Sequence, residues 1–181
     1  RLAEWADLVA VVTQPDRPSG RGMTLTSSPI KNAALAKKIP IFQPERIRKE
    51  PDFIKTLSDL APDIIIVVAF GQILPEAVLR IPRLGCINIH ASLLPKYRGA
   101  APIQWALIRG EKTTGVASMQ MDVGMDTGAI LLQQALSIGD SETAPELSLR
   151  LSKIGAEVLL ETIKQIKKGQ LLPTPQPSSG A

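Results

Sequence analysis

The sequence is poor in the residues that build metal sites, disulfides and base-stacking surfaces. It has one cysteine, Cys86, and one histidine, His90, in 181 residues. One cysteine cannot form an intrachain disulfide. One cysteine and one histidine together cannot supply a cysteine-based or histidine-rich metal site. Aromatic residues make up 3% of the chain, too few for a sheet that stacks RNA bases. The longest apolar run, residues 64–70, is far shorter than the roughly 20 residues of a membrane helix, so we expect neither a metal nor a membrane partner.

What remains is the composition of a folded domain. The chain is 44% hydrophobic and 21% charged, which is enough to bury a core. Its length fits one domain, or one domain and part of a second. The net charge of +4 permits an anionic partner without demanding one.

Strand-like and helix-like segments alternate along the chain. Apolar runs predict strands at residues 8–12, 41–43, 63–69 and 85–90, and helical patterns predict helices at 29–39, 45–60, 75–79 and 101–109. Residues 13–28 are expected to be a loop. Two strands at 114–121 and 130–138 are close enough to be antiparallel, and a long amphipathic helix follows at 143–168. This order predicts a doubly wound α/β domain, with a mostly parallel twisted sheet flanked by helices.

The strand at residues 85–90 holds the first candidate site. Side chains two apart on a strand share a face, so Cys86, Asn88 and His90 point the same way. Ligands of open parallel sheets bind outside the carboxyl ends of the strands, which is where His90 lies. The pair Asn88 and His90 is therefore either functional or a hydrogen-bonded structural pair. A nucleophilic Cys86 is a weaker alternative, since cysteine is often simply buried.

Two loops are further candidates. The segment 121–128 contains Asp122 and Asp126 among glycines, a pattern typical of turns that has too few acceptors for a calcium loop. The loop 13–28 is long for a connection between a strand and a helix and contains Arg17 and Arg21. Long loops on a rigid scaffold are often functional, although a mobile surface insertion explains this one equally well.

The segment Asn88-Ile-His90-Ala-Ser-Leu-Leu-Pro95, which continues as Lys-Tyr-Arg-Gly-Ala-Ala-Pro-Ile-Gln104, resembles the folate-dependent formyltransferases. Their signature combines Asn-x-His, a Ser-Leu-Leu-Pro loop and a downstream Asp in a Gly-rich turn. Asp126 follows Asn88 by 38 positions, which matches that spacing. Residues 13–22, 67–75 and 119–128 are similar to the methionyl-tRNA formyltransferase branch of the family.

The resemblance implies a Rossmann-like catalytic domain followed by a β-barrel domain. On this basis residues 1–170 are the catalytic domain, truncated at the N-terminus by its first strand and helix. The Pro/Ser/Gly-rich residues 171–181 are then a linker towards an absent C-terminal β-barrel domain. Such proteins are cytoplasmic in bacteria or organellar in eukaryotes, and a monomer is expected.

The implied reaction moves a formyl group from 10-formyltetrahydrofolate to the amino group of methionyl-initiator tRNA, without a metal. Asn88, His90 and Asp126 are the implied catalytic residues, with Arg17 and Arg21 contacting the tRNA. The implied folate-binding residues come from three segments: Phe70, Gly71, Gln72, Ile73 and Leu74; Ser92, Leu93, Leu94 and Pro95; and Met121, Asp122 and Met125. Two alternatives stay open: a formyltransferase acting on an amino sugar or on glycinamide ribonucleotide, and an inactive folate-binding module.

Overall fold

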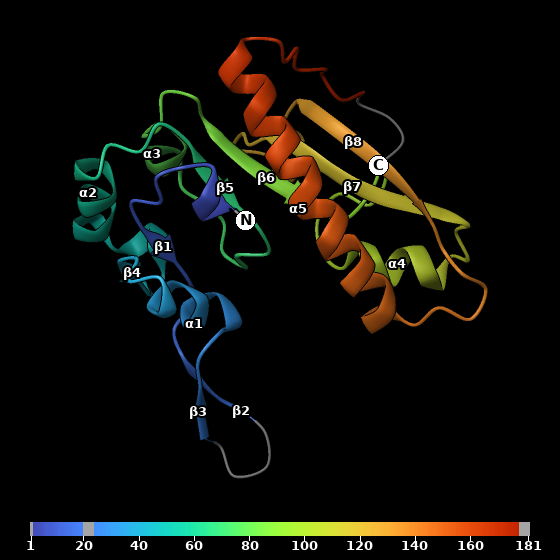
Figure 1. The fold of residues 1–181 in the computed structure, drawn as a ribbon, viewed down its shortest axis with the longest axis horizontal. Coiled ribbons are helices and arrows are strands. Elements are labelled where there is room, and N and C mark those ends of the chain that lie inside the picture. Colours follow the sequence, from blue (N-terminus) through green and yellow to red (C-terminus); the bar gives the residue numbers. More distant parts are fainter. Residues whose placement is uncertain (1, 20–23, 178–181) are drawn as a thin grey trace. The chain divides into compact units, whose positions relative to one another are not determined.

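The fold is described from a computed structural model that covers residues 2–19 and 24–177. The chain divides into two compact units, and each is described by itself. The first unit comprises Arg1–Asp63 and Phe70–Arg83, and the second comprises Ile64–Ala69 and Leu84–Ala181. Figure 1 labels the elements of both units. In the described part of the chain, no helix is both long and apolar enough to cross a membrane.

The first unit is built on two short parallel strands, β1 (Val11–Val12) and β4 (Ile41–Phe42). Helix α1 (Pro29–Ala36) precedes β4. Ser28 caps α1, because its Oγ accepts a hydrogen bond from the Lys31 amide at 3.1 Å. The other helical elements of this unit are η1 (Leu2–Glu4), η2 (Ile47–Lys49), α2 (Pro51–Asp59) and α3 (Glu76–Leu79).

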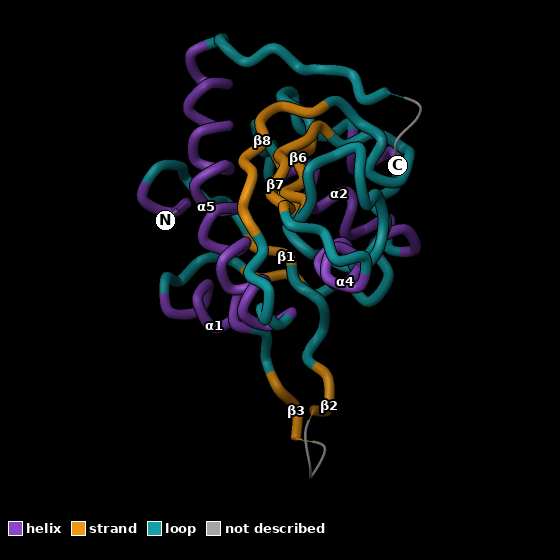
Figure 2. Tube along the Cα trace, turned by 90° about the vertical axis from the view of Figure 1, so that its right-hand side faces the viewer, coloured by secondary structure: helices purple, strands orange, loops and turns teal. Residues whose placement is uncertain are grey.

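Two expectations for the first unit are wrong in detail. Residues 13–28 are not wholly loop, because β2 (Arg17–Ser19) and β3 (Thr24–Thr26) pair as an antiparallel ladder that extends beyond α1 (Figures 1 and 2). An edge strand tolerates Pro18, which cannot donate a backbone hydrogen bond. The expected helix at 45–60 is split into η2 and α2, since Pro51 begins a new helix.

The second unit contains a four-stranded mixed sheet in the order β5-β6-β7-β8. Strand β5 (Ile65–Val67) runs parallel to β6 (Cys86–His90), whereas β7 (Thr113–Gln120) and β8 (Ile130–Ser137) complete the sheet in antiparallel fashion. The predicted α/β class and the predicted antiparallel pair are therefore confirmed. The sheet is mixed rather than mostly parallel, because β7 returns next to β6 without a crossover.

Helix α5 (Ala144–Lys168) covers one face of this sheet (Figure 1). Its core cluster consists of Val116 on β7 and of Leu147, Leu151 and Val158 on the helix. A Cβ atom at Gly155 would lie 3.3 Å from the Ile89 side chain, so α5 packs tightly on β6. Because side chains alternate, α5 takes the Ile87 and Ile89 face and leaves Asn88 and His90 on the other. Helix α4 (Pro102–Ile108) adds Ile103 and Leu107 to the same core.

Candidate active site

Strand β6 places Asn88 and His90 opposite two residues of β7. Asn88 pairs with Met119 and His90 with Ala117 in the antiparallel register. Ala117 and Met119 are almost fully buried, so the strand that holds the candidate residues has a rigid neighbour. His90 itself is only 6% exposed. An imidazole buried at the end of a strand needs defined partners, because an unsatisfied buried polar group is costly.

Asp126 lies in the connection between β7 and β8, where its carboxylate faces three groups. Oδ1 accepts a hydrogen bond from Asn88 Nδ2 at 3.3 Å, and Oδ2 accepts one from the Gly99 amide at 2.9 Å. Oδ2 also lies 3.5 Å from His90 Nδ1. The structure thus brings together Asn88, His90 and Asp126, which the sequence singled out.

The hydrogen bonds of His90 define where its exchangeable proton sits. Nε2 lies 2.8 Å from the carbonyl oxygen of Tyr97, which can only accept. Nε2 therefore carries a proton, and Nδ1 is the ring nitrogen that faces the Asp126 carboxylate. The arrangement resembles an acid–base pair in which the acid also orients the ring.

Asp122 and Cys86 take no part in this cluster. Asp122 is exposed, and its oxygens accept hydrogen bonds from the Gly124 amide and from Thr127 Oγ1 at 2.9–3.0 Å. It therefore shapes the turn, and Asp126 is the carboxylate that lies beside Asn88 and His90. Cys86 is 1% exposed, and burial raises the pKa of its thiol to about 11. A thiol that stays protonated near neutral pH is a poor nucleophile, which argues against the nucleophilic alternative.

The sequence comparisons agree with this geometry. The family model described as formyl transferase matches residues 2–163. The chain belongs to the formyl transferase family.

Two curated relatives illustrate the match. The methionyl-tRNA formyltransferase of Thermodesulfovibrio yellowstonii is 56% identical over 175 residues, and that of Caldanaerobacter subterraneus subsp. tengcongensis is 51% identical over 173 residues. These alignments cover 97% and 96% of this chain, and 56% of each relative. The chain thus spans about half the length of the curated relatives it matches.

Solved structures share the fold at lower identity. The phosphoribosylglycinamide formyltransferase from Anaplasma phagocytophilum has a TM-score of 0.78 at 23% identity, covering 97% of this chain and 83% of its own. The formyltransferase PseJ from Anoxybacillus kamchatkensis, solved with a UDP-linked formamido sugar and tetrahydrofolate, has a TM-score of 0.68 at 21% identity. That alignment covers 94% of this chain and 82% of PseJ. The predicted Rossmann-like formyltransferase fold is confirmed.

The family's Ser-Leu-Leu-Pro loop follows β6 and is anchored by its own side chains. Ser92 is fully buried and donates a hydrogen bond from Oγ to the Lys96 carbonyl oxygen at 2.6 Å. Leu94 packs in a core cluster with Ala117 and Met119. Leu93 approaches Gly115, where an added Cβ would lie 2.5 Å from its side chain. The loop therefore presents mainly backbone to any ligand.

The other implied folate-binding segments lie in separate units. Residues 121–125 belong to the second unit, where Met121 is half-buried and Met125 is 64% exposed. Residues 70–74 belong to the first unit, where Gly71 has a left-handed φ of +77° and Leu74 is buried. Gln72 is turned to the backbone before η2: its Oε1 accepts from the Ile47 amide, and its Nε2 donates to the carbonyl oxygens of Pro44 and Glu45. Ile73 is 62% exposed and Phe70 is partly buried.

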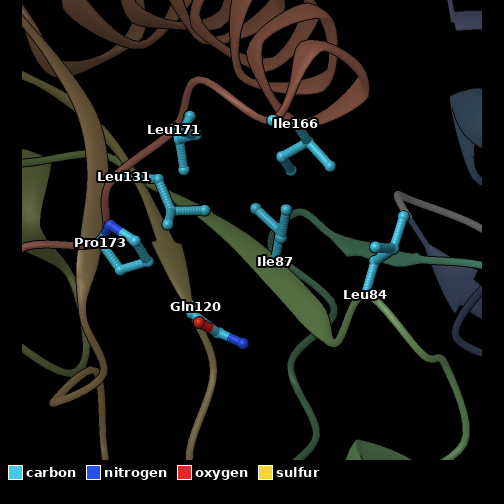
Figure 3. A pocket seen from close by; sticks show the side chains of 8 residues that line it. Leu84, Ile87, Gln120, Leu131, Ile166, Leu171 and Pro173 are labelled. Carbon is cyan, nitrogen blue, oxygen red and sulfur yellow. The ribbon is translucent and has the colours of Figure 1, made fainter.

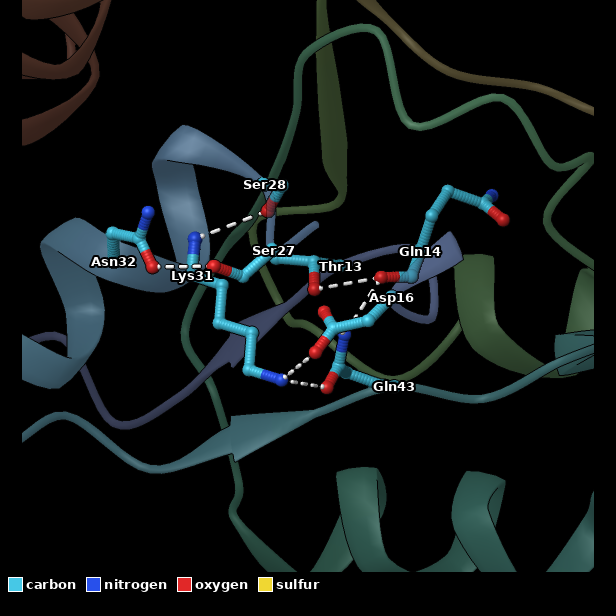
Figure 4. A network of polar contacts seen from close by, with 8 residues as sticks. All are labelled: Thr13, Gln14, Asp16, Ser27, Ser28, Lys31, Asn32 and Gln43. Carbon is cyan, nitrogen blue, oxygen red and sulfur yellow. Dashed lines mark hydrogen bonds and ion pairs between the residues drawn. The ribbon is translucent and has the colours of Figure 1, made fainter. Parts of the chain in front are cut away.

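The base of the arginine-containing hairpin is held by a polar network (Figure 4). Lys31 Nζ donates to Asp16 Oδ2 at 2.5 Å and to Gln43 Oε1 at 2.7 Å. The hydrogen bond from Lys31 lowers the pKa of the Asp16 carboxyl, and Gln43 adds to the effect. Asp16 is thus engaged by Lys31, while the neighbouring Arg17 is exposed on β2. Arg21 lies outside the described residues.

A cavity of about 430 Å³ adjoins the loop after β6. This loop contains Tyr97, whose carbonyl oxygen is bound by His90. Three of its lining residues are cations and one is an acid; the lining is formed by Lys96, Tyr97, Arg98, Ala100, Trp105, Arg109 and Glu111. The Arg109 guanidinium lies over the Tyr97 and Trp105 rings at 5.4 and 5.8 Å. A hydrogen bond to Glu111 raises the pKa of the Tyr97 phenol, and the same bond lowers the pKa of Glu111.

Sequence reasoning missed the two backbone groups that complete the cluster. Tyr97 contributes a carbonyl oxygen and Gly99 an amide, and a backbone atom has no residue-type signature. Gly99 does have one usable signal, because its φ of +84° favours glycine. Among the described residues, no group of three or more His, Cys, Asp or Glu is placed to hold a metal ion.

Proposed function

We propose that the protein carrying this chain transfers a formyl group from 10-formyltetrahydrofolate to the amino group of methionyl-initiator tRNA. The observation that supports it most directly is the Asn88–His90–Asp126 cluster, in a chain 51–56% identical to the methionyl-tRNA formyltransferases cited above. In this proposal residues 1–170 are the catalytic domain and residues 171–181 lead out of it. The family match over residues 2–163 supports that assignment.

The chemistry begins when the amine attacks the formyl carbon, and the carbonyl oxygen becomes anionic. The Asn88 amide has two N–H groups, of which one binds Asp126 and the other can stabilise that oxyanion. A donor of this kind is worth roughly 10²–10³ in rate. The attacking nitrogen then loses a proton, and the folate nitrogen gains one as the C–N bond breaks. His90 Nδ1 and Asp126, 3.5 Å apart, form the relay for that proton.

The formyl donor needs a slot with apolar walls and backbone hydrogen-bonding groups. We assign folate binding to residues 70–74 of the first unit and to residues 92–95, 121, 122 and 125 of the second. PseJ, a structural neighbour, was solved with tetrahydrofolate, which supports a folate donor. The inward-facing side chains of Ser92 and Leu94 are consistent with recognition through the loop backbone. This mechanism assigns no step to a metal.

The acceptor tRNA is a polyanion, and two basic features suit it. Arg17 is the first residue of β2, and Arg21 lies between β2 and β3 in the sequence. Arginine binds phosphate through its planar fork. The cavity beside His90 adds Lys96, Arg98 and Arg109 against a single acid. We further propose that the protein acts as a monomer, in the bacterial cytoplasm or an organelle where initiator tRNA is used.

Formyl transfer from 10-formyltetrahydrofolate tests the proposal when three acceptors are compared. We expect methionyl-tRNA to be formylated at rates orders of magnitude above glycinamide ribonucleotide and an amino sugar nucleotide. A higher rate with either small amine would show that this amine, and not methionyl-tRNA, is the acceptor. Folate binding without transfer to any of the three would favour the inactive folate-binding module.

A further inference from the structure

Residues 171–177, called here the tail, contact the sheet of the second unit within the described part of the chain. Leu171 and Pro173 line an apolar cavity of about 200 Å³ together with Leu131 and Ile166 (Figure 3). Thr174 then forms an isolated antiparallel bridge with Ile130, through two backbone hydrogen bonds of 2.8 Å. The register of this bridge brings residue 176 opposite residue 128, next to the turn that holds Asp126.

The Gln176 side chain uses both of its N–H donors at this turn. Its Nε2 donates to the carbonyl oxygens of Asp126 at 2.9 Å and Gly128 at 2.7 Å. Its Oε1 accepts from Arg98 Nε at 2.9 Å. Arg98 also donates from Nη2 to the Pro177 carbonyl oxygen at 2.9 Å. One amide therefore joins the tail to both loops of the site.

The two joined loops are those that hold the carboxylate in place. Arg98 directly precedes Gly99, whose amide binds Asp126 Oδ2, while Gln176 binds the backbone of Asp126 itself. Asp126 has a left-handed φ of +53°, which is unfavourable for a residue other than glycine and persists only when its surroundings hold it. Gly128 is buried, and a Cβ there would lie 1.8 Å from the Gln120 carbonyl oxygen, so the turn has no room to rearrange on that side.

We propose that Gln176 is a positioning residue that fixes Asp126 relative to His90. The expected effect on kcat rests on the proposed function. The expected effect on the position of Asp126 relative to His90 does not depend on the substrate. Gln176 touches no reacting atom in this assignment. Its two N–H groups define the path of the backbone at Asp126, and the carboxylate follows that path.

The isosteric variant Gln176→Glu gives the sharpest test. It keeps the volume and the acceptor for Arg98 but replaces the NH2 group, with its two donors, by one carboxylate oxygen that repels the Asp126 and Gly128 carbonyls. Two neutral hydrogen bonds are together worth a factor of roughly 5 to 150. We expect kcat for methionyl-tRNA formylation to fall by about tenfold to a hundredfold, with KM for both substrates changed less than about threefold. We expect kcat of Gln176→Ala to fall by a factor in the same range.

The chain offers a second readout that needs no substrate. His90 is the one histidine of this chain, so the Hε1 proton of its imidazole gives a single NMR signal that reports the position of the Asp126 charge. We expect this signal to shift in Gln176→Glu and Gln176→Ala at fixed pH. The matched control is Gln170→Ala, on the exposed residue just after α5, which should leave both kcat and the signal unchanged. Thr174→Ala removes only a side chain from the tail and should behave as the control does.

The outcomes separate this inference from the proposed function. If the unmodified protein does not formylate methionyl-tRNA, the proposed function fails, and the histidine signal still decides the role of Gln176. If both Gln176 variants keep a normal kcat and an unshifted signal, the inference is overturned. It is equally overturned if both variants lose the fold, since Gln176 would then be a folding residue.

Discussion

Replacing Asp126 by Asn removes one charge and turns the oxygen that accepts from Asn88 into an N–H donor. Asn has the same shape, is tolerated at a φ of +53° better than most residues, and can still accept the hydrogen bond from the Gly99 amide. It cannot stabilise a proton on His90 Nδ1, which faces the carboxylate at 3.5 Å. Positioned acid–base groups contribute roughly 10²–10⁴ in rate, so we expect kcat to fall by that factor, equivalent to about 2.7–5.4 kcal/mol of transition-state stabilisation.

The assay is single-turnover formylation of methionyl-tRNA with saturating 10-formyltetrahydrofolate, accompanied by urea unfolding. The fold should survive, because a weakened buried polar contact costs about 1–3 kcal/mol. Asp122→Asn is the matched comparison in the same turn, and we expect it to lower kcat far less, since its oxygens serve Gly124 and Thr127. Combining Asp126→Asn with His90→Ala should cost much less than the product of the two single effects. A folded Asp126→Asn protein within tenfold of normal turnover would refute the relay.

Three further predictions follow from buried or strained positions. Thr162→Val should lower the free energy of unfolding by about 1–3 kcal/mol in urea titrations, because it leaves the fully buried Ser118 hydroxyl without the partner 2.7 Å away; an unchanged midpoint would contradict this. Since burial raises the pKa of Cys86 to about 11, the folded state keeps a proton that the unfolded thiol loses near pH 9, so stability should fall between about pH 9 and 11. The fall should be smaller in Cys86→Ala, and an equal fall would assign it to other groups. A bulky residue at Gly71, where φ is +77°, should raise the dissociation constant for folate in equilibrium binding, and an unchanged constant would place the slot elsewhere.

The sequence predicts the position of the site because strand geometry is local. The alternation along β6 places Asn88 and His90 on one face, and the long apolar stripe at 143–168 predicts the helix that covers the other. The Thr143 cap is equally local, since Thr143 and Glu146 form a reciprocal capping box. The turn with two aspartates is visible in the sequence too, although only the hydrogen bonds show that Asp126 is the one beside Asn88 and His90.

The contacts that complete the site depend on pairings between distant segments. Gln176 reads as part of a Pro-rich linker, and nothing in residues 173–177 predicts the bridge to Ile130. The hairpin at residues 17–26 was missed because Pro18 argues against a strand. By contrast, the break before α2 was predictable, since Pro51 is a favourable first residue of a helix.

The separation of the site residues along the chain also bears on the order in which the molecule folds. Asn88 and Asp126 are 38 residues apart, and Asp126 and Gln176 are 50 apart. Closing long loops costs conformational entropy before any contact compensates for it, so non-local pairings form more slowly than helices. We therefore expect the Asn88–His90–Asp126 cluster to form after α5 and after the pairing of β7 with β8. A newly made chain should acquire its helices before it brings these three side chains together.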